Sequence, residues 1–248
     1  MGIDGLNIMV TGAAKGIGKS IAEIMGARGA NLSLCDIEES MLCTTAGEIA
    51  ARGVRSVWRR TDVSDQAQVD KFVDFTRREL GEIDVLVNNA GIYILRSIDE
   101  ISNEEWDRVM AVNLRSCFMF CKAVLPGMRE RKFGRIINMA SAAGKSGGTT
   151  CGAHYAASKG GILAFTRYLA KQVGMEGVTV NAVAPSSIAA DMVLGLSSED
   201  QRKAIDVTVV KRFGRVDEVA EAVCYLADRN SGFVTGETIN VNGGVIMD

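Results

Sequence analysis

Seven short apolar segments alternate with segments of helical length along this chain of 248 residues. Segment 84–87 contains the continuous apolar run Val-Leu-Val, as expected of a parallel strand that is buried on both faces. Regular alternation of strands and helices predicts an α/β fold, in which a doubly wound parallel sheet carries helices on both faces. The segments expected to form the seven strands are 6–10, 30–36, 54–60, 84–87, 135–139, 178–183 and 237–241.

We expect a single Rossmann-fold domain over residues 1–248. No Pro/Ser-rich linker, low-complexity segment or charge run divides the chain, and 47% hydrophobic residues are enough for one sizeable core. Chains of about 200–250 residues with this pattern are often single domains. The segment 104–128 reads as two helices, and 186–209 reads as irregular, then weakly helical, in a place suited to a lid over substrate.

Three glycines follow the first predicted strand, in the sequence Thr11-Gly12-Ala-Ala-Lys-Gly16-Ile-Gly18. A strand, a glycine-rich turn and a helix open a dinucleotide-binding unit. Gly12 permits a tight turn, and Gly16 and Gly18 allow backbone to approach a pyrophosphate. The N–H groups at the start of the following helix favour that anion.

An acidic residue, Asp36, ends the second predicted strand about twenty residues after the glycines. In dinucleotide-binding units such a carboxylate accepts hydrogen bonds from the adenosine ribose, and it repels a 2′-phosphate. Asp36 therefore favours NAD over NADP. The alternative is that Asp36 caps the helix that follows it.

Tyr155 and Lys159 are four residues apart in a predicted helix, so their side chains share one face. An ammonium beside a phenol is expected to lower the pKa of the tyrosine from roughly 10, which would suit it to move a proton to or from an alcohol or carbonyl oxygen. Ser141, after the fifth strand, could hydrogen-bond the same oxygen. The alternative is an exposed Tyr and Lys at a helix start.

Further polar residues lie at or near the ends of predicted strands or on an apolar helix face. Asp62 is either a contact to the adenine amino group or a turn residue, and the asparagines at 88 and 89 either border the nicotinamide ribose or tie strands together. Asn113 is either a satisfied core amide or the anchor of a water that relays protons to Lys159. His154 either contacts substrate or caps a helix.

Bulk properties argue against several classes of function. A net charge of −2 gives no field that attracts nucleic acid or a membrane surface, and no apolar run approaches the roughly 18 residues of a membrane span. The first residues do not resemble a secretory signal. Six cysteines without a CxxC pair and one histidine do not form a zinc site, so we expect no metal, reduced and mostly buried thiols, and a cytoplasmic protein.

Taken together, the motifs resemble those of the short-chain dehydrogenase/reductase family over nearly the whole length. The resemblance rests on Thr11-Gly12-x-x-x-Gly16-x-Gly18, Asp62-Val63, Asn88-Asn89-Ala90-Gly91, Asn113, Ser141, Tyr155-x-x-x-Lys159, Asn181-Ala-Val-Ala-Pro185 and the closing Gly236 with Asn242-Gly243-Gly244. It implies NAD(P)-dependent oxidation of a secondary alcohol or reduction of a ketone, with no nucleic-acid or membrane partner. It also implies a homo-oligomer, a dimer or tetramer, built on the helices that contain Asn113 and Tyr155.

The resemblance assigns roles to individual residues. Tyr155 would be the general acid/base, Lys159 would lower its pKa and hold the nicotinamide ribose, Ser141 would orient the substrate oxygen, and Asn113 would hold the relay water. The residues expected at the cofactor, for which we favour NAD, are Gly12, Ala14, Lys15, Gly16, Ile17, Gly18, Asp36, Ile37, Asp62, Val63, Asn89, Ala90, Gly91, Tyr155, Lys159, Pro185, Ser186 and Ile188.

Two departures from the family pattern affect the segment after strand six. Ser186-Ser187 stands where a glycine usually follows the proline, and Ala190 replaces a threonine that meets the nicotinamide carboxamide. Ser186 or Ser187 could substitute for the lost hydroxyl.

One alternative function is an NADPH-dependent 3-oxoacyl-thioester reductase, and an alternative of another class is a catalytically silent, nucleotide-bound scaffold or regulator. The segments 93–96, 142–154 and 186–196 are the candidate substrate lining.

Overall fold

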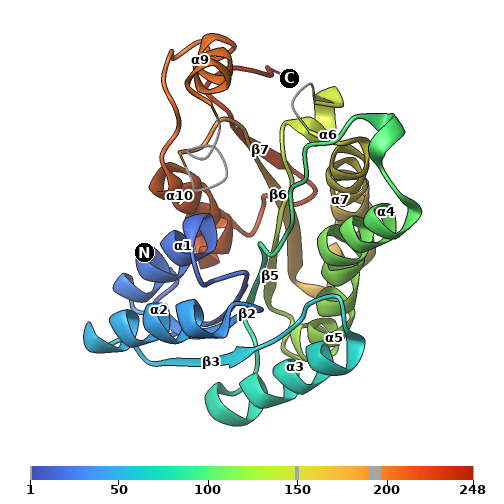
Figure 1. The fold of residues 1–248 in the computed structure, drawn as a ribbon. Coiled ribbons are helices and arrows are strands. Elements are labelled where there is room, and N and C mark those ends of the chain that lie inside the picture. The colour runs from blue at the N-terminus through green and yellow to red at the C-terminus, as the bar shows by residue number, and fades with distance from the viewer. Residues whose placement is uncertain (1, 149–150, 190–196, 248) are drawn as a thin grey trace.

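The computed structural model describes residues 2–148, 151–189 and 197–247. These residues contain a parallel sheet of seven strands (Figure 1). The strand order is β3-β2-β1-β4-β5-β6-β7. The strands are β1 Asn7–Thr11, β2 Asn31–Asp36, β3 Ser56–Arg60, β4 Val85–Asn88, β5 Gly134–Met139, β6 Val178–Pro185 and β7 Thr238–Val241. The predicted fold class and all seven strands are confirmed.

Helices cover both faces of the sheet. They are α1 Gly16–Ala27, α2 Glu39–Ala51, α3 Gln66–Leu80, α4 Asn103–Met110, α5 Ser116–Arg131, α6 Ala143–Ser146, α7 Ala153–Val173, α9 Ser198–Asp206 and α10 Val216–Ala227. Alternate residues of β1 point to opposite faces, because side chains along a strand have a period of two. Ile8 and Val10 therefore belong to one core and Met9 to the other.

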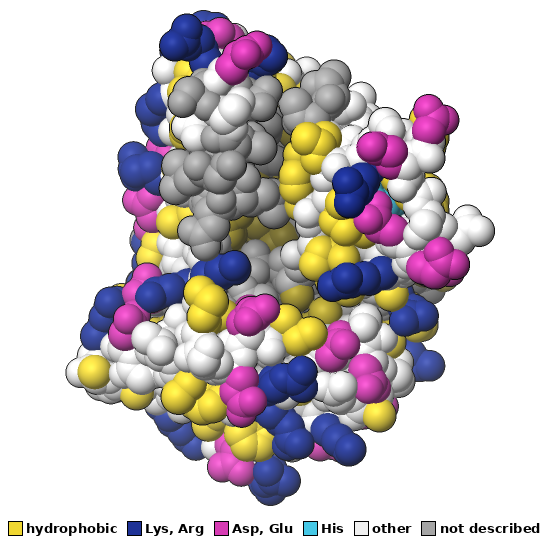
Figure 2. All heavy atoms as spheres, in the orientation of Figure 1, with side chains coloured by type: hydrophobic (Ala, Val, Ile, Leu, Met, Phe, Trp, Pro, Cys, Tyr) yellow, Lys and Arg dark blue, Asp and Glu magenta, His cyan; other side chains and the backbone are white. Residues whose placement is uncertain are grey.

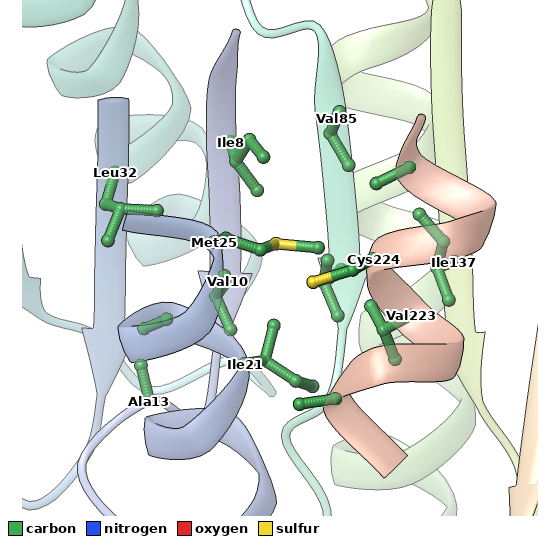
Figure 3. Close-up of a cluster of buried hydrophobic side chains, with 14 of the residues drawn as sticks. Ile8, Val10, Ala13, Ile21, Met25, Leu32, Val85, Ile137, Val223 and Cys224 are labelled. Carbon is green, nitrogen blue, oxygen red and sulfur yellow. The ribbon is translucent and has the colours of Figure 1, made fainter. Parts of the chain in front are cut away.

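The first core lies between the sheet and helices α1, α2 and α10. Figure 3 shows Ile21 and Met25 of α1 and Val223 and Cys224 of α10 directed toward Val10 and its neighbours on the strands. The second core lies on the opposite face, against α3, α5 and α7. Both cores are built from fully buried aliphatic and aromatic side chains, which hold the strand ends at fixed positions.

The order of the strands places β1 beside β4, so the chain turns from one half of the sheet to the other between them. In open α/β sheets, ligands bind outside the carboxyl ends of the strands at such a switch point. The predicted cofactor residues of the first glycine-rich turn and of the Asn88–Gly91 segment follow these two strands. The topology therefore brings them to one place.

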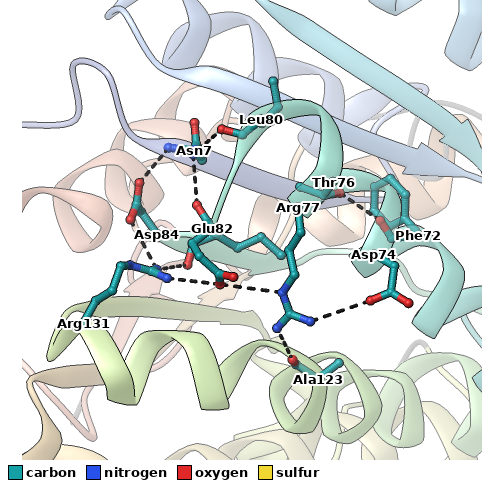
Figure 4. A network of polar contacts seen from close by, with 11 residues as sticks. Asn7, Phe72, Asp74, Thr76, Arg77, Leu80, Glu82, Asp84, Ala123 and Arg131 are labelled. Atoms are coloured by element: carbon teal, nitrogen blue, oxygen red, sulfur yellow. Dashed lines mark hydrogen bonds and ion pairs between the residues drawn. The ribbon is translucent and has the colours of Figure 1, made fainter.

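The opposite end of the sheet is held by a polar network (Figure 4). The amide of Asn7 donates to the Leu80 and Glu82 carbonyls, and its backbone N–H donates to Asp84. Arg131 of α5 reaches Glu82 at 3.1 Å and the Ile83 carbonyl at 2.8 Å. This network joins the starts of β1 and β4 to α3 and α5, far along the strands from the glycine-rich turn.

The segment predicted as two helices, 104–128, is one continuous helical run. Between α4 and α5 the chain forms a π-helical turn, Ala111–Arg115, which contains Asn113. Such turns are rare, and they occur frequently at functional sites. The predicted long helical region with two helices is confirmed by α4 and α5, and the widened turn, which accommodates an extra residue, joins them without a gap.

This run, Asn103–Arg131, is long and apolar enough by length and composition to cross a membrane. The expectation that no apolar segment approaches the length of a membrane span is therefore corrected for this helical run. Half of its most apolar window is buried inside the protein, and Phe120, Val124 and Met128 belong to the core against the sheet. These contacts favour a core helix.

A large-to-small substitution in the second core should be costly. Phe72 of α3 is 0% exposed and meets Phe120 edge to face, with ring centroids 6.4 Å apart. Phe72→Ala should lower the free energy of unfolding by about 3–5 kcal/mol, because it removes buried surface and leaves a cavity. Urea titration followed by circular dichroism measures this change.

The matched control is Phe233→Ala, at a side chain that is 104% exposed. We expect it to change the free energy of unfolding by less than about 0.5 kcal/mol. Equal losses in the two variants would contradict the assignment of Phe72 to the core.

Candidate active site

The carboxyl ends of β1, β4, β5 and β6 meet on one side of the sheet, and the loops that follow them carry most of the predicted site residues. Figure 2 shows the surface hollowed in the middle of this face, with hydrophobic side chains along the rim of the hollow. The sequence placed a nucleotide and a reacting carbon at this end.

The backbone is closely packed at two glycines, Gly12 in the turn between β1 and α1 and Gly18 in the first turn of α1. Gly12 has a φ of 65°, and a Cβ at this position would lie 2.8 Å from the Cα of Ala90. A Cβ at Gly18 would lie 2.0 Å from the Gly12 carbonyl oxygen. Helix α1 begins at Gly16 after Lys15, whose side chain has no hydrogen-bond acceptor to cap the first N–H groups. The predicted close approach of backbone to a pyrophosphate fits this geometry.

The loop after β4 is tied to this turn. Asn89 Nδ2 donates to the carbonyl oxygens of Thr11 and Gly12 at 3.0 and 2.9 Å. Thr11 Oγ1 accepts from the backbone N–H groups of Asn89 and Ala90, both at 3.0 Å. The expectation that the asparagines tie strands together is confirmed for Asn89. Sequence reasoning missed Thr11, although it directly precedes the first glycine.

Asp36 lies at the end of β2, beside the glycine-rich turn. Its carboxylate accepts from the backbone N–H of Ala14 at 3.0 Å and from that of Glu38 at 3.1 Å. Helix α2 begins at Glu39 and its N-cap residue is Glu38, so the alternative that Asp36 caps this helix is wrong. Ala14 is thus near Asp36 through its backbone, and Arg60 of β3 stands opposite Asp36 in the sheet register.

Asp62 follows β3 and is used within its own turn. Its Oδ1 accepts from the backbone N–H and the hydroxyl of Ser64, at 2.9 and 2.7 Å. Asp65, rather than Asp62, caps helix α3. Of the neighbouring cofactor candidates, Val63 is buried and Ile37 is exposed.

Tyr155, Lys159 and Ser141 come together beyond β5. The side chain of Ser141 lies beside that of Tyr155 and acts to lower the pKa of the tyrosine. Lys159 Nζ lies 5.7 Å from the centroid of the Tyr155 ring and donates to the Met139 carbonyl at 2.7 Å. The shared helix face predicted from the four-residue spacing therefore exists, and the alternative of an exposed pair is wrong because Lys159 is buried.

The pKa of the tyrosine differs from the prediction. Burial raises the pKa of Tyr155 to about 12, and the neighbouring Cys151 and Tyr93 add to the rise, whereas the side chain of Ser141 opposes it. We expected Lys159 to lower this pKa. The direction is the opposite because loss of hydration by the phenol dominates, and burial lowers the pKa of Lys159 itself to about 8.

Asn113 is fully buried next to these groups. Its Oδ1 accepts from the Ile92 N–H at 2.8 Å, and its Nδ2 donates to the Ile92 carbonyl and to Ser158 Oγ, both at 3.0 Å. Both amide hydrogens are therefore used within the protein, as in the alternative of a satisfied core amide. A Cβ at Gly91 would lie 3.3 Å from Asn113 Oδ1 and 3.5 Å from Lys159 Nζ, which places these three residues side by side.

Two residues near Tyr155 were not given roles by sequence reasoning. Ser158 links Asn113 to helix α7, since its hydroxyl also donates to the Tyr155 carbonyl at 2.7 Å. Tyr93 packs edge to face on Tyr155, with ring centroids 5.1 Å apart. The signal for Ser158 was its position directly before Lys159, whereas a lone aromatic in a loop, such as Tyr93, gives no comparable signal.

The segment after β6 borders the same site. The Pro185 carbonyl accepts from Ala142 N–H at 3.0 Å, Ser186 N–H donates to Val241, and Ile188 bridges to Gly214. Ser187 has a φ of 52°, and its hydroxyl donates to the Ala204 carbonyl at 3.0 Å, so that proton is used within the protein. Ala190 lies outside the described residues.

The chain is similar to known oxidoreductases over its full length. A family model described as enoyl-(acyl carrier protein) reductase matches residues 12–246. The 3-oxoacyl-[acyl-carrier-protein] reductase of Escherichia coli is 39% identical over 248 residues, which are 100% of both chains. Nodulation protein G of Azospirillum brasilense is 40% identical over 241 residues, 96% of both chains.

Solved structures give the same result. The 3-oxoacyl-[acyl-carrier protein] reductase of Brucella melitensis superposes with a TM-score of 0.95 at 36% identity, covering 100% of this chain and 93% of that one. The sheet order, the glycine-rich turn and the Ser141, Tyr155 and Lys159 cluster agree with this likeness. The chain therefore belongs to the short-chain dehydrogenase/reductase family and is an oxidoreductase that acts on an alcohol or ketone group with a nicotinamide cofactor.

Proposed function

We propose that the protein transfers a hydride between NAD and a small secondary alcohol or ketone, with Tyr155 as general acid/base. The observation that carries the proposal is the grouping of three side chains: Lys159 Nζ lies 5.7 Å from the centroid of the Tyr155 ring, and Ser141 lies beside the same tyrosine. Two hydroxyls at one point can bind a single substrate oxygen. The buried amine keeps positive charge close to that point.

The residues present fit a dinucleotide. The turn at Gly12 and Gly18 has space for backbone but not for a Cβ, and the start of α1 offers N–H groups to a pyrophosphate. Asp36 lies beside this turn, where the adenosine ribose is expected. The further cofactor residues named from the sequence are proposed to complete the site. When bound, the nicotinamide supplies the hydride for reduction or accepts it in oxidation.

The protein supplies the proton. In reduction, the Tyr155 hydroxyl gives its proton to the substrate oxygen and is left as a phenolate. In oxidation, the Tyr155 phenolate takes the proton of the substrate hydroxyl. A pKa of about 12 keeps the hydroxyl protonated in the free protein, which suits the acid role. Ser141 orients the substrate oxygen, and Lys159 holds the nicotinamide ribose and supplies positive charge. Asn113 fixes the segment at Ile92, from which a water can return a proton to Tyr155.

NAD is the proposed cofactor because of Asp36. Its carboxylate is held by the Ala14 and Glu38 backbone N–H groups in an orientation beside the glycine-rich turn. A 2′-phosphate at this position would meet a negative charge, whereas ribose hydroxyls can donate to it. Arg60, opposite Asp36 in the register, is the residue that would have to offset that repulsion for NADP to bind.

A second candidate is an NADPH-dependent 3-oxoacyl-thioester reductase. It is supported by the names of the similar proteins from Escherichia coli and Brucella melitensis, both 3-oxoacyl-[acyl-carrier-protein] reductases. The two candidates share the proton chemistry of Tyr155. They differ in the cofactor and in the substrate, so the cofactor measurement below separates them.

We also propose a homo-oligomer, a dimer or tetramer, formed through α5 and α7. A groove of about 820 Å³ is lined by α4, the π-helical turn, α5 and α7; its lining includes the exposed Phe118 and the partly buried Leu114 and Phe165. It contains neither Tyr155 nor Lys159. Apolar side chains in a groove of this kind are suited to a second copy of the chain.

A cytoplasmic location is proposed from the thiols. All six cysteines are free; Cys35, Cys117, Cys121 and Cys224 are buried, which confirms that they are mostly buried. Burial raises the pKa of the Cys117 thiol to about 11, so it stays protonated and unreactive at neutral pH. Such thiols are typical of a reducing compartment.

Removal of the proposed acid/base should abolish turnover but not binding. Tyr155→Phe keeps the ring and loses only the hydroxyl, so NADH binding by fluorescence should persist while kcat falls at least about 100-fold, as general acid–base groups contribute. Tyr168→Phe is the matched control on the same helix, at a side chain that is 63% exposed. Near-normal turnover of Tyr155→Phe would refute the role.

Asp36 should determine the cofactor. Fluorescence titration of the wild-type protein should show tighter binding of NADH than of NADPH. Asp36→Ala should weaken NADH binding on the order of 10-fold or more, because hydrogen bonds to a charged group are lost, and should narrow the preference. Glu39→Ala, at the exposed start of α2, is the control. Tight NADPH binding by the wild type would favour the thioester reductase.

Burial of Lys159 should appear in the pH dependence of stability. Folding lowers its pKa from 10.5 to about 8, so the unfolded chain binds more protons between these pH values and Lys159 adds stability as pH rises through them. The free energy of unfolding of the wild type minus that of Lys159→Met should therefore increase, on the order of 1–3 kcal/mol, from pH 8 to 10.5. Most buried thiols act oppositely but equally in both proteins. Cys117 differs, because Lys159 lowers its pKa in the wild type, and loss of this interaction in Lys159→Met acts in the same direction as the expected increase. A flat difference would contradict this prediction.

A further inference from the structure

The single histidine of the chain, His154, directly precedes Tyr155 and is 0% exposed. Sequence reasoning left it as either a substrate contact or a cap of the helix. In the structure its ring lies near Trp106 of α4, with centroids 6.5 Å apart. The residue is therefore enclosed between α4 and the start of α7, and it is not used by the mechanism described above.

Both ring nitrogens of His154 have partners. Nδ1 accepts the backbone N–H of Tyr155 at 2.8 Å, and Nε2 lies 3.1 Å from Glu105 Oε1. A backbone N–H can only donate, so Nδ1 carries no proton. The ring proton is on Nε2 and is donated to the Glu105 carboxylate. The two hydrogen bonds together fix one tautomer and one orientation of the ring.

The acceptor at Nδ1 meets a need of helix α7. The first N–H groups of a helix have no partner in the helix, and a side chain at the N-cap usually satisfies one of them. Here the N-cap is Gly152, which has no side chain. Tyr155 N–H is 3.0 Å from the Gly152 carbonyl and is shared with His154. A Cβ at Gly152 would lie 2.4 Å from His154 Cε1, so glycine leaves the space that the ring fills.

The same contacts join the helix start to two other elements. Gly152 N–H donates to the Ile94 carbonyl at 3.1 Å, in the loop after β4. Glu105, which holds His154 from α4, also pairs with Arg96 of that loop at 3.7 Å. The backbone of Tyr155 is therefore connected through His154 and Glu105 to helix α4 and to the loop after β4.

We propose that His154 is a positioning residue for Tyr155. Its Nδ1 holds the backbone of residue 155, Glu105 holds the ring, and the Tyr155 hydroxyl is thereby kept beside Ser141. This inference rests on the proposed acid/base role of Tyr155. A displacement of a reacting group by about 1 Å can cost on the order of 100-fold in rate, so a backbone anchor at this residue has a direct effect on catalysis.

Three substitutions separate the two hydrogen bonds. His154→Asn places an amide oxygen near the position of Nδ1 but does not reach Glu105. His154→Gln places its amide near the position of Nε2 and loses the acceptor for Tyr155 N–H. His154→Leu loses both. Asn and Gln each remove one hydrogen bond from a buried site, so a purely structural role predicts similar losses of Tm and of kcat in these two variants.

The measurements are kcat, the KM for NADH and Tm, with the carbonyl substrate that gives the highest wild-type rate in a ketone panel. We expect His154→Gln and His154→Leu to lose about 10–100-fold in kcat. We expect His154→Asn to stay within about threefold of wild type, with the KM for NADH within twofold in all soluble variants. If His154→Leu does not fold, the Asn and Gln pair decides alone.

Two results would overturn the inference: equal kcat in the Asn and Gln variants, or losses of kcat that follow Tm. Tyr155→Phe, measured in parallel, separates this from a failure of the proposed function. An inactive Tyr155→Phe beside fully active His154 variants rejects the anchor and leaves the acid/base role in place. An active Tyr155→Phe rejects the acid/base role, and the anchor with it.

Discussion

Two asparagine side chains, the partly buried Asn89 and the fully buried Asn113, hold the loop after β4 in place, and the site depends on these contacts. Asn89 bridges that loop to the backbone of β1 at Thr11 and Gly12, while Asn113 clasps both the N–H and the carbonyl of Ile92. Without these contacts, the loop at the carboxyl end of β4 would have no fixed position relative to helix α7. With both amides in place, Gly91 lies against Lys159, and the glycine-rich turn and the proton-transfer residues face one crevice.

The two ends of the sheet are stabilised by different means. At the amino ends of β1 and β4, Asn7 and Asp84 belong to a network of hydrogen bonds and ion pairs, which Figure 4 shows. At the carboxyl ends, glycines and the partly exposed Tyr155 replace such pairs. Stability is thus supplied at one end, while the other keeps polar groups available to a cofactor and a substrate.

The sequence was sufficient for much of the fold because apolar period and glycine position act locally. The seven strands, the turn at Gly12 and the shared face of Tyr155 and Lys159 follow from spacing alone. The π-helical turn at Asn113 could not be read in this way, since its pattern differs from an α-helix by one residue. The tyrosine pKa was predicted in the wrong direction because spacing does not report burial. The contacts of Thr11 and Ser158 could not be predicted either, because their partners, Asn89 and Asn113, are distant in the sequence.

The similar proteins identify the type of reaction, which is oxidation or reduction at an alcohol or ketone group, but not the substrate or the preferred nicotinamide cofactor of this chain. This chain shares about two residues in five with the similar proteins, and its own sheet places a phenol and an amine beside the strand ends. Under the proposed function, Asp36 and the segment after β6 determine which cofactor and which substrate bind. Their side chains are local, so cofactor choice and substrate choice can change without any change in the sheet.

The widened turn at 111–115 has one further consequence for the architecture. An α-helix rotates by about 100° per residue, so an inserted residue turns everything after it relative to everything before it. Helix α4 can therefore present Glu105 toward His154 while α5, on the same helical run, presents Phe120 to the sheet. Loss of one residue there would leave each half of the run intact and point them at the wrong neighbours.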